Sequence, residues 1–398
     1  MIIWFPLVIP IIGVVLMNVL WREKVVWWEN ILPPIVTLIV IALLKVGVEK
    51  AQVTDIEYWT GWVKEARYYE DWNELVTYTE TETDSKGNSR TVTKTRVDYH
   101  PAYWQMIDSN SQVHGIKQGL YKHYVTYFGN RKFKDLHRSY HTNDGDLYYA
   151  TWPGTREKIE PVTTLHTYEN RVQASNSIFK FPKVSEDDQK RLLDYPHKKV
   201  GTFRSLPWRF QPSILTQVKN VPNFKKADSL LTHHNARLGK KKQIRIWLLV
   251  FGPKTTLQDG MNQESFWQKG NKNELNLCVG LDNDNKVTWV HVFSWTEAQM
   301  LTVGTRDEMA KQIGQPVDLV HIVEWLIPEV QSKWVRKQFA DFSYLTVEPP
   351  AWGIVLAFIV AILVTGGCIA FAILNDIDEG DKVNWGNRRR FGSFRRFR

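Results

Sequence analysis

An uncharged apolar run near the C-terminus constrains this chain most. Residues 351–374 read AWGIVLAFIVAILVTGGCIAFAIL and contain no charged side chain. A helix of roughly 20 apolar residues crosses a hydrocarbon layer of about 30 Å, because each residue adds about 1.5 Å. Pro349 and Pro350 stand before the run and separate it from any preceding helix. The run predicts a transmembrane helix over 351–375, which excludes a chain that folds wholly in water.

The N-terminus holds two more apolar segments. Residues 2–21 are also uncharged, although Pro6 and Pro10 each remove a backbone donor and are expected to kink a helix. A cleaved secretory signal is the alternative, but its positively charged start and small-residue cleavage site are both missing. Residues 31–44 are short and reach spanning length only if neighbouring residues join them. We predict a hairpin of two membrane segments over 1–48.

Aromatic and basic residues beside these segments indicate how they sit in a bilayer. Tryptophan prefers the headgroup level, and basic residues near the spans mark the cytoplasmic side. The predicted interface residues are Trp21, Trp27, Trp28 and Trp352, and the predicted cytoplasmic tail over 376–398 contains Arg388, Arg389, Arg390, Arg395, Arg396 and Arg398. This arrangement predicts a protein integral to the membrane, in a bacterial inner membrane, with its soluble region outside the cytoplasm.

The basic tail also suggests a ligand. Its arginines alternate with phenylalanines, a composition that suits anionic lipid headgroups. A topology signal without further function and contacts with nucleic acid are the alternatives. Because the tail adjoins the last span, lipid is favoured over nucleic acid.

The region 49–182 is predicted to be rich in strands. Threonine, tyrosine, valine and tryptophan alternate with polar residues, as on a half-buried pleated surface. Its clearest element is a hairpin over 74–99, with a turn at Asp84–Asn88. The expected cross-strand ion pairs join Glu74, Glu80 and Glu82 to Arg90, Lys94 and Arg96. Such an arm either contacts a neighbour or stays solvated.

After a basic connector over 183–242, the pattern changes to that of an α/β domain over 243–346. We expect strands over 243–252, 274–282 and 286–295, a helix over 256–268, and helices over 296–314 and 317–339, of which Pro328 is expected to kink or split the last. The sequence therefore predicts an α+β membrane protein. It has three transmembrane helices and a large soluble region, which consists of a β-rich part and an α/β sandwich.

The α/β segment carries a resemblance. The order of elements over 243–339, with GNKNELNLCVGLDNDNKVTWVHVFSW at its centre, resembles the TPM-domain family. That resemblance implies an exocytoplasmic domain tethered by a nearby transmembrane helix, with phosphatase activity or a role in assembling or repairing membrane complexes. The Asn-Gly of the family falls on Asn273, but Glu274 replaces the glycine, which affects the acidic metal site of a phosphatase. Segments such as DYHPAYW are similar to uncharacterised membrane proteins of tailed phages and some bacteria.

One histidine pair is the best candidate for chemistry. His137 and His141 would share a helix face, and Asp144 or Asp146 would complete a divalent metal site. Arg138 stands where the helix motif of metalloproteases has glutamate. The alternative is a pair of partly buried histidines before an Asp-Gly turn. No other cofactor is expected, and the sequence offers no complete catalytic set.

These patterns favour a structural or interaction protein over an enzyme. We expect an oligomer that presents its exocytoplasmic domain to other membrane or periplasmic proteins, with close helix contacts at Gly366 and Gly367. The expected partners are further copies of the chain and membrane lipids. The alternative is a membrane-tethered, metal-dependent, phosphatase-like hydrolase that uses the histidine pair. A subunit of an oligomeric channel is third.

Overall fold

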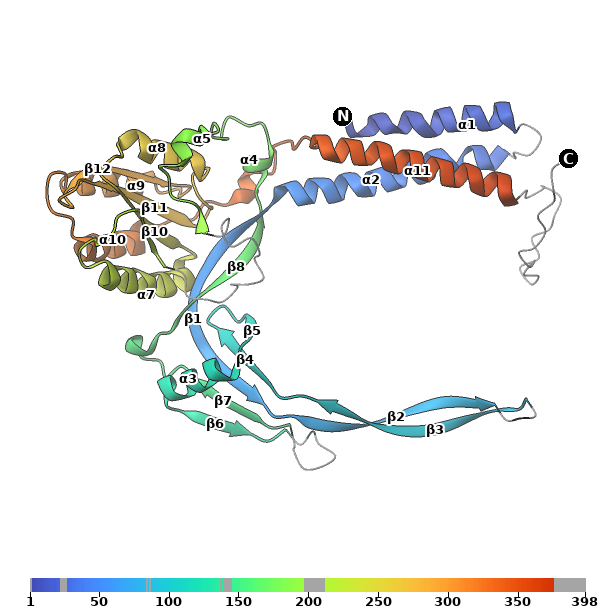
Figure 1. Ribbon diagram of the computed structural model, residues 1–398, viewed down its shortest axis with the longest axis horizontal. Helices are drawn as coiled ribbons and strands as arrows, with labels where there is room; N and C mark the ends of the chain where they lie inside the picture. The colour runs from blue at the N-terminus through green and yellow to red at the C-terminus, as the bar shows by residue number, and fades with distance from the viewer. Residues whose placement is uncertain are drawn as a thin grey trace. The chain divides into compact units, whose positions relative to one another are not determined.

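The computed structural model describes residues 2–21, 27–83, 85, 87–136, 138, 145–196 and 212–375. The chain forms two compact units (Figure 1). The first lies within Met1–Thr54, Asn170–Ser177 and Phe342–Arg398, and the second takes Asp55–Glu169 and Ile178–Asp341. Each unit is therefore built from segments that are distant in the sequence.

Long apolar helices make up most of the first unit. Its elements are η1 (Ile2–Leu7), α1 (Val8–Leu20), η2 (Trp27–Asn30), α2 (Leu32–Val53), α4 (Arg171–Ala174) and α11 (Ala351–Asn375). Among the described residues, three stretches are long and apolar enough to cross a membrane: Ile3–Leu20, Trp27–Val53 and Ala351–Ile373. The second stretch gains its length because α2 continues past the predicted segment to Val53. Three such helices indicate a protein integral to a membrane.

Helices α1, α2 and α11 lie side by side (Figure 1). Small residues permit their close contacts. A Cβ atom added at Gly13 of α1 would lie 2.5 Å from Cγ2 of Thr365 in α11, and one added at Gly353 would lie 2.9 Å from Cγ1 of Val48. The hydroxyl oxygens of Thr37 and Thr365 lie 3.5 Å apart. Helices in an apolar solvent associate through such close contacts, because water exclusion does not drive them together.

The short segment Asn170–Ser177 completes the first unit. Asn170 donates its backbone N–H to the carbonyl of Val53 at 2.6 Å. Arg171 forms an ion pair with Glu49 at 3.1 Å and donates to the carbonyl of Leu345 at 3.3 Å. The start of α4 is therefore held between the end of α2 and the residues that precede α11.

A six-stranded sheet forms the first part of the second unit. Its elements are β1 (Thr54–Tyr69), β4 (Tyr103–Asp108), β5 (Val113–Gly115), α3 (Gln118–Phe128), β6 (Arg131–Lys134), β7 (Leu147–Thr151), η3 (Arg156–Lys158) and β8 (Pro161–Glu169). The strand order is β5-β4-β1-β7-β6, and β8 also pairs with β1. Helix α3 packs on one face, where Tyr124 and Phe128 meet Ala66, Met106 and Ala150. Strands β2 (Trp72–Thr83) and β3 (Ser89–His100) form a separate two-stranded sheet.

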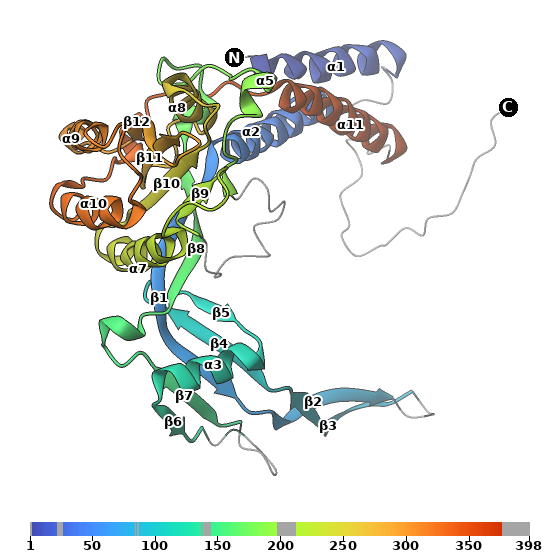
Figure 2. The same ribbon diagram turned by 60° about the vertical axis from the view of Figure 1, so that its left-hand side comes forward.

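A mixed α/β sheet forms the rest of the second unit (Figure 2). Its elements are β9 (Ile214–Thr216), α7 (Phe224–Lys242), β10 (Arg245–Phe251), α8 (Leu257–Phe266), β11 (Glu274–Leu281), β12 (Val287–Ser294), α9 (Gln299–Ala310) and α10 (Leu319–Lys333), with α5 (Glu186–Gln189) before them and η4 (Phe339–Phe342) after them. The strand order is β12-β11-β10-β9, in which only β12 is antiparallel to its neighbour.

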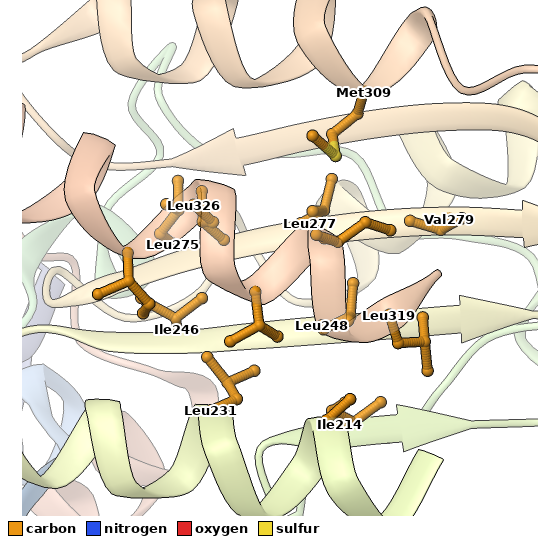
Figure 3. Close-up of a cluster of buried hydrophobic side chains, with 14 of the residues drawn as sticks. Ile214, Leu231, Ile246, Leu248, Leu275, Leu277, Val279, Met309, Leu319 and Leu326 are labelled. Atoms are coloured by element: carbon orange, nitrogen blue, oxygen red, sulfur yellow. The ribbon is translucent and has the colours of Figure 1, made fainter. Parts of the chain in front are cut away.

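The two faces of this sheet have different cores. Aliphatic side chains on one face, among them Ile246, Leu248 and Leu277, pack against α7, α9 and α10 (Figure 3). Aromatic side chains such as Trp247 and Phe251 gather on the other face, where α8 packs. Strands β10 and β11 are buried on both faces, which explains their nearly continuous apolar sequences.

The predicted fold class is confirmed: an α+β chain with two apolar helices at the N-terminus, one at the C-terminus, and several sheets, one of them mixed α/β. The α/β sheet, however, starts earlier than the predicted boundary at residue 243, since β9 and α7 lie within the predicted connector. Helix α10 runs unbroken through Pro328, because its apolar face is held against the sheet.

Candidate functional site

Strands β2 and β3 form a long ribbon that pairs with itself. Each strand has 12 residues, and the pairing runs without a break from Trp72↔His100 to Thr83↔Ser89. At about 3.4 Å per residue, each arm is roughly 40 Å long. No third strand among the described residues pairs with it. Since isolated two-stranded hairpins are marginally stable, the ribbon needs support from its own side chains and its base.

The two faces of the ribbon differ in charge. Successive side chains of a strand point to opposite faces. On one face, threonines stand opposite one another at Thr77↔Thr95, Thr79↔Thr93 and Thr81↔Thr91, with Leu75↔Val97 and Asn73↔Tyr99 nearer the base. Every charged side chain of the two strands falls on the other face. We call these the threonine face and the charged face.

Acidic and basic side chains of the charged face form ion pairs with one another. Lys94 Nζ lies 2.9 Å from Glu80 and 2.8 Å from Glu82, and Arg90 lies 3.5 Å from Glu82. The hydrogen bond from Lys94 is the largest cause that lowers the pKa of Glu82. The predicted pairs of Glu80 and Glu82 with Arg90 and Lys94 are therefore confirmed.

The other two predicted partners pair differently. Glu74 contacts His100 at 3.0 Å, and Arg96 contacts Asp98 at 3.0 Å. Arg96 stands opposite Val76 in the register, so the expectation that Glu74 and Arg96 take cross-strand partners from the predicted set was wrong. With these contacts, most charges of the ribbon find a partner within the ribbon itself.

Aromatic side chains hold the base of the ribbon. Trp72 stacks on His100 with ring centroids 4.2 Å apart, and Tyr69 stacks on Tyr103 at 4.6 Å. Gly145 has a φ of 61°, and a Cβ atom there would lie 2.8 Å from the Trp72 ring. This close approach fixes the first residue of β2 against the loop before β7 and so sets the direction of the ribbon.

The structure describes only part of the predicted metal site. His137, His141 and Asp144 lie outside the described residues. The Asp146 carboxylate accepts the backbone N–H of Leu136 at 3.0 Å. The described residues contain no group of three side chains with the spacing of a metal site, so the site stays a prediction.

The structure also describes only some of the predicted membrane-contacting residues. The six arginines of the tail lie outside the described residues. The four tryptophans are described: Trp21 follows α1, Trp27 and Trp28 lie in η2 before α2, and Trp352 lies in the first turn of α11. Trp27 and Trp352 keep 66% and 55% of their surface exposed, which places large amphipathic rings at helix ends.

Sequence reasoning missed a buried ionic cluster around Glu57. The Glu57 side chain is fully buried, and Nη2 of Arg336 donates to its two oxygens at 2.7 and 2.9 Å. His166 Nδ1 and Trp59 Nε1 contact the same carboxylate at 3.1 and 2.9 Å, and Lys272 Nζ lies 3.8 Å away. The cluster joins β1 and β8 to the α/β sheet. Its residues are too far apart in the sequence for any spacing to reveal them.

Glu274, which stands where the TPM resemblance leads us to expect a glycine, is also buried. Its carboxylate is fully buried, accepts a hydrogen bond from the Tyr195 hydroxyl, and accepts the backbone N–H of Asn271 at 2.9 Å. Burial raises its pKa. These contacts give Glu274 a structural role within the domain.

Two further side chains of the α/β sheet, Cys278 and Asp282, have structural roles. Burial raises the pKa of the Cys278 thiol well above its usual range, which favours the unreactive protonated form. The Asp282 carboxylate accepts the N–H groups of Asp284 and Lys286 at 2.9 and 2.8 Å and so closes the hairpin turn. Turn chemistry accounts for this aspartate without a metal.

Comparison of the chain with protein-family models, with curated proteins and with solved structures finds no match. The class of protein therefore rests on the fold itself. It is an α+β protein with three helices suited to a membrane and a second unit that carries a mixed α/β sheet, a six-stranded sheet and a free ribbon.

Proposed function

We propose that this chain is a membrane-anchored structural protein that self-associates and presents its second unit to partner proteins outside the cytoplasm. The observation that carries the proposal is the contrast between the two faces of the β2–β3 ribbon. The charged face pairs its own charges, whereas the threonine face offers uncharged hydroxyl and methyl groups in register. A surface without charge can meet an identical surface without repulsion or loss of ion pairs.

The size of the ribbon supports an assembly of several contacts. A face roughly 40 Å long and two strands wide, at about 4.8 Å between strands, covers about 400 Å². A stable pair of proteins usually buries about 800 Å² on each partner. One ribbon contact is therefore weak alone, and further contacts must add to it.

The last apolar helix offers such a second contact. A Cβ atom added at Gly366 or Gly367 would meet nothing within 4 Å, so these glycines are not used to pack α11 against α1 and α2. Adjacent small residues permit close approach of another helix in a membrane. Weak contacts at the ribbon and at α11, made by the same two copies, would strengthen each other through their effective concentration.

The proposed orientation rests on the sequence. The basic tail after α11 favours the cytoplasm, which places the second unit on the other side of a bacterial inner membrane. A cysteine introduced at Ser85, in the ribbon turn, tests this directly. A membrane-impermeant maleimide added to whole spheroplasts should label it, and protection from the reagent would contradict the orientation.

The test of self-association is crosslinking of the full-length chain in membranes. Thr79→Lys places a charge on the threonine face and should shift the population from higher oligomers toward monomers. Val92→Lys is the matched control, because it adds the same charge to the charged face, opposite Glu80. Equal crosslinking of Thr79→Lys and the unmodified chain would overturn the role of the threonine face. Only monomers in the unmodified chain would overturn self-association.

A further inference from the structure

A row of aromatic side chains crosses the six-stranded sheet on one face. Trp104 of β4, Tyr68 of β1, Tyr148 of β7 and Phe133 of β6 are direct partners in the strand register. The Tyr68 ring stacks on Trp104 with centroids 5.4 Å apart and on Tyr148 at 5.8 Å. Because side chains stand roughly perpendicular to a sheet, rings stacked in this way turn their edges outward. Ring edges carry partial positive charge.

A pocket lies between this row and one face of α3, which lines it from Gln118 to Thr126. Its volume is about 410 Å³, and its lining includes Tyr68 and Trp104 from the sheet, Tyr121 and Lys122 from α3, and Arg131 from β6. Pockets for small ligands usually measure about 300–1,000 Å³ and combine apolar walls with a few polar groups. The size and lining of this pocket agree with that pattern.

Two cations of the pocket lack an acidic partner. Lys122 and Arg131 are exposed, and neither forms an ion pair with a carboxylate among the described residues. The guanidinium of Arg131 lies 4.5 Å from the centre of the Tyr148 ring, which orients it along the aromatic row. An anion that entered the pocket would therefore meet two charges that no ion pair already neutralises.

A tyrosine hydroxyl lies in the pocket wall beside Arg131. The Tyr121 hydroxyl is buried, and burial is the largest cause that raises its pKa. The charge of Arg131 and a side-chain hydrogen bond from it lower that pKa, so the guanidinium lies close to this hydroxyl. Arg131 is therefore placed between Tyr121 and the Tyr148 ring, within the pocket lining.

Acidic groups also act on this row. Burial is the largest cause that raises the pKa of Tyr68, and the charges of Glu70 and Asp71 act in the same direction. Burial, and next Glu70, also raise the pKa of Tyr148, whereas the charge of Arg131 lowers it. An anion in the pocket is therefore expected beside the two cations and not beside the tyrosine hydroxyls.

We propose that this pocket binds a small anion that carries a flat ring. The anionic group, a phosphate or a carboxylate, lies between Lys122 and Arg131, and the ring lies against Tyr68 and Trp104. This binding is independent of the ribbon contact, which uses other strands.

The test uses the full-length protein in detergent and isothermal titration with four probes: phenyl phosphate, benzoate, inorganic phosphate and benzyl alcohol. One of the two ring-bearing anions should bind about tenfold more tightly than inorganic phosphate or benzyl alcohol, and the comparison of phenyl phosphate with benzoate identifies the preferred anion. Absence of binding by both ring-bearing anions would overturn the proposal. Inorganic phosphate that bound as tightly as phenyl phosphate would remove the role of the ring.

Variants assign the binding to this pocket. Arg131→Gln and Lys122→Gln should each weaken binding of the preferred probe about tenfold, as expected when a hydrogen bond to a charged group is lost. Lys132→Gln is the matched control, since Lys132 follows Arg131 in β6 and points to the opposite face of the sheet, over Tyr149. Equal affinity of Arg131→Gln, Lys122→Gln and the unmodified chain would place the probe elsewhere and overturn the assignment.

Discussion

The buried pair of Glu57 and Arg336 gives the strongest prediction about stability. Glu57 has no exposed side-chain surface, and Arg336 keeps only 14%. Arg336→Met removes the guanidinium but preserves most of its apolar stem. Loss of one partner of a buried ion pair typically costs about 3–5 kcal/mol, because the remaining charge stays buried.

The neighbours of Glu57 reduce this cost. Lys272 at 3.8 Å and His166 at 3.1 Å still face the carboxylate in the variant. We therefore expect the lower end of the range, about 3 kcal/mol. A change of about 1 kcal/mol lowers the Tm of a domain of this size by about 2–4 °C, so the transition should fall by about 6–12 °C. Near-ultraviolet circular dichroism of the full-length protein in detergent follows it, because buried tryptophans dominate that signal.

Two further variants make the result interpretable. Lys337→Met alters the next residue, whose ion pairs with Glu297 and Asp341 lie at the surface, and should cost less than about 1 kcal/mol. The double variant Glu57→Gln with Arg336→Met should lose less than the sum of the two single changes, because the uncompensated charge is gone. If Arg336→Met lowered the Tm no more than Lys337→Met does, the reasoning would be refuted. The pair of Glu57 and Arg336 would then behave as a solvated surface pair.

Three other outcomes follow from the structure. Burial is the main cause that lowers the pKa of His234 below its ordinary value of 6.5, so the unfolded chain binds more protons there than the folded chain. Stability should therefore fall as the pH drops below about 6.5, and His234→Gln should reduce that slope in thermal unfolding from about pH 7 to about pH 5. Gly280→Ala drives its new methyl group into the Trp289 indole and should cost about 1–3 kcal/mol in thermal unfolding. Gly13→Leu should reduce disulfide crosslinking between cysteines placed in α1 and α11, because even a Cβ atom there lies 2.5 Å from a side chain of α11, whereas Gly47→Leu, with open space around it, should leave the crosslinking unchanged.

Hydropathy and the alternation of polar and apolar residues predict much of this fold, because each depends only on residues that are close together in the sequence. A span must be apolar over its whole length, so residues 351–374 reveal α11 without knowledge of its neighbours. A hairpin repeats with period two around a turn, so 74–99 reveals β2 and β3. The same period, applied to the threonines of both arms, would also have revealed the threonine face.

The remaining features depend on contacts between distant residues. Strand β9 has three residues, too few to show a period, and is defined by its pairing with β10. Glu57 and Arg336 meet across 279 positions. The anion pocket draws its side chains from β1, β4, α3 and β6, each of which alone suggests an ordinary surface. Sequence spacing reveals residues that lie close together along one helix or strand. The β9–β10 pairing, the Glu57–Arg336 pair and the pocket each join residues of different elements, so spacing does not reveal them.

The divided first unit has a consequence for biosynthesis. Helices α1 and α2 leave the ribosome roughly 300 residues before α11, and at about 5–20 residues per second the delay is about 15–60 s. Throughout that interval the face of α2 that holds Thr37 lacks its partner Thr365. The segment at Asn170 and Arg171 emerges well before α11 and binds the end of α2 at Val53 and Glu49. This early contact would fix the end of α2 before α11 is made, so the last helix would meet an α2 whose C-terminal end is already held in place.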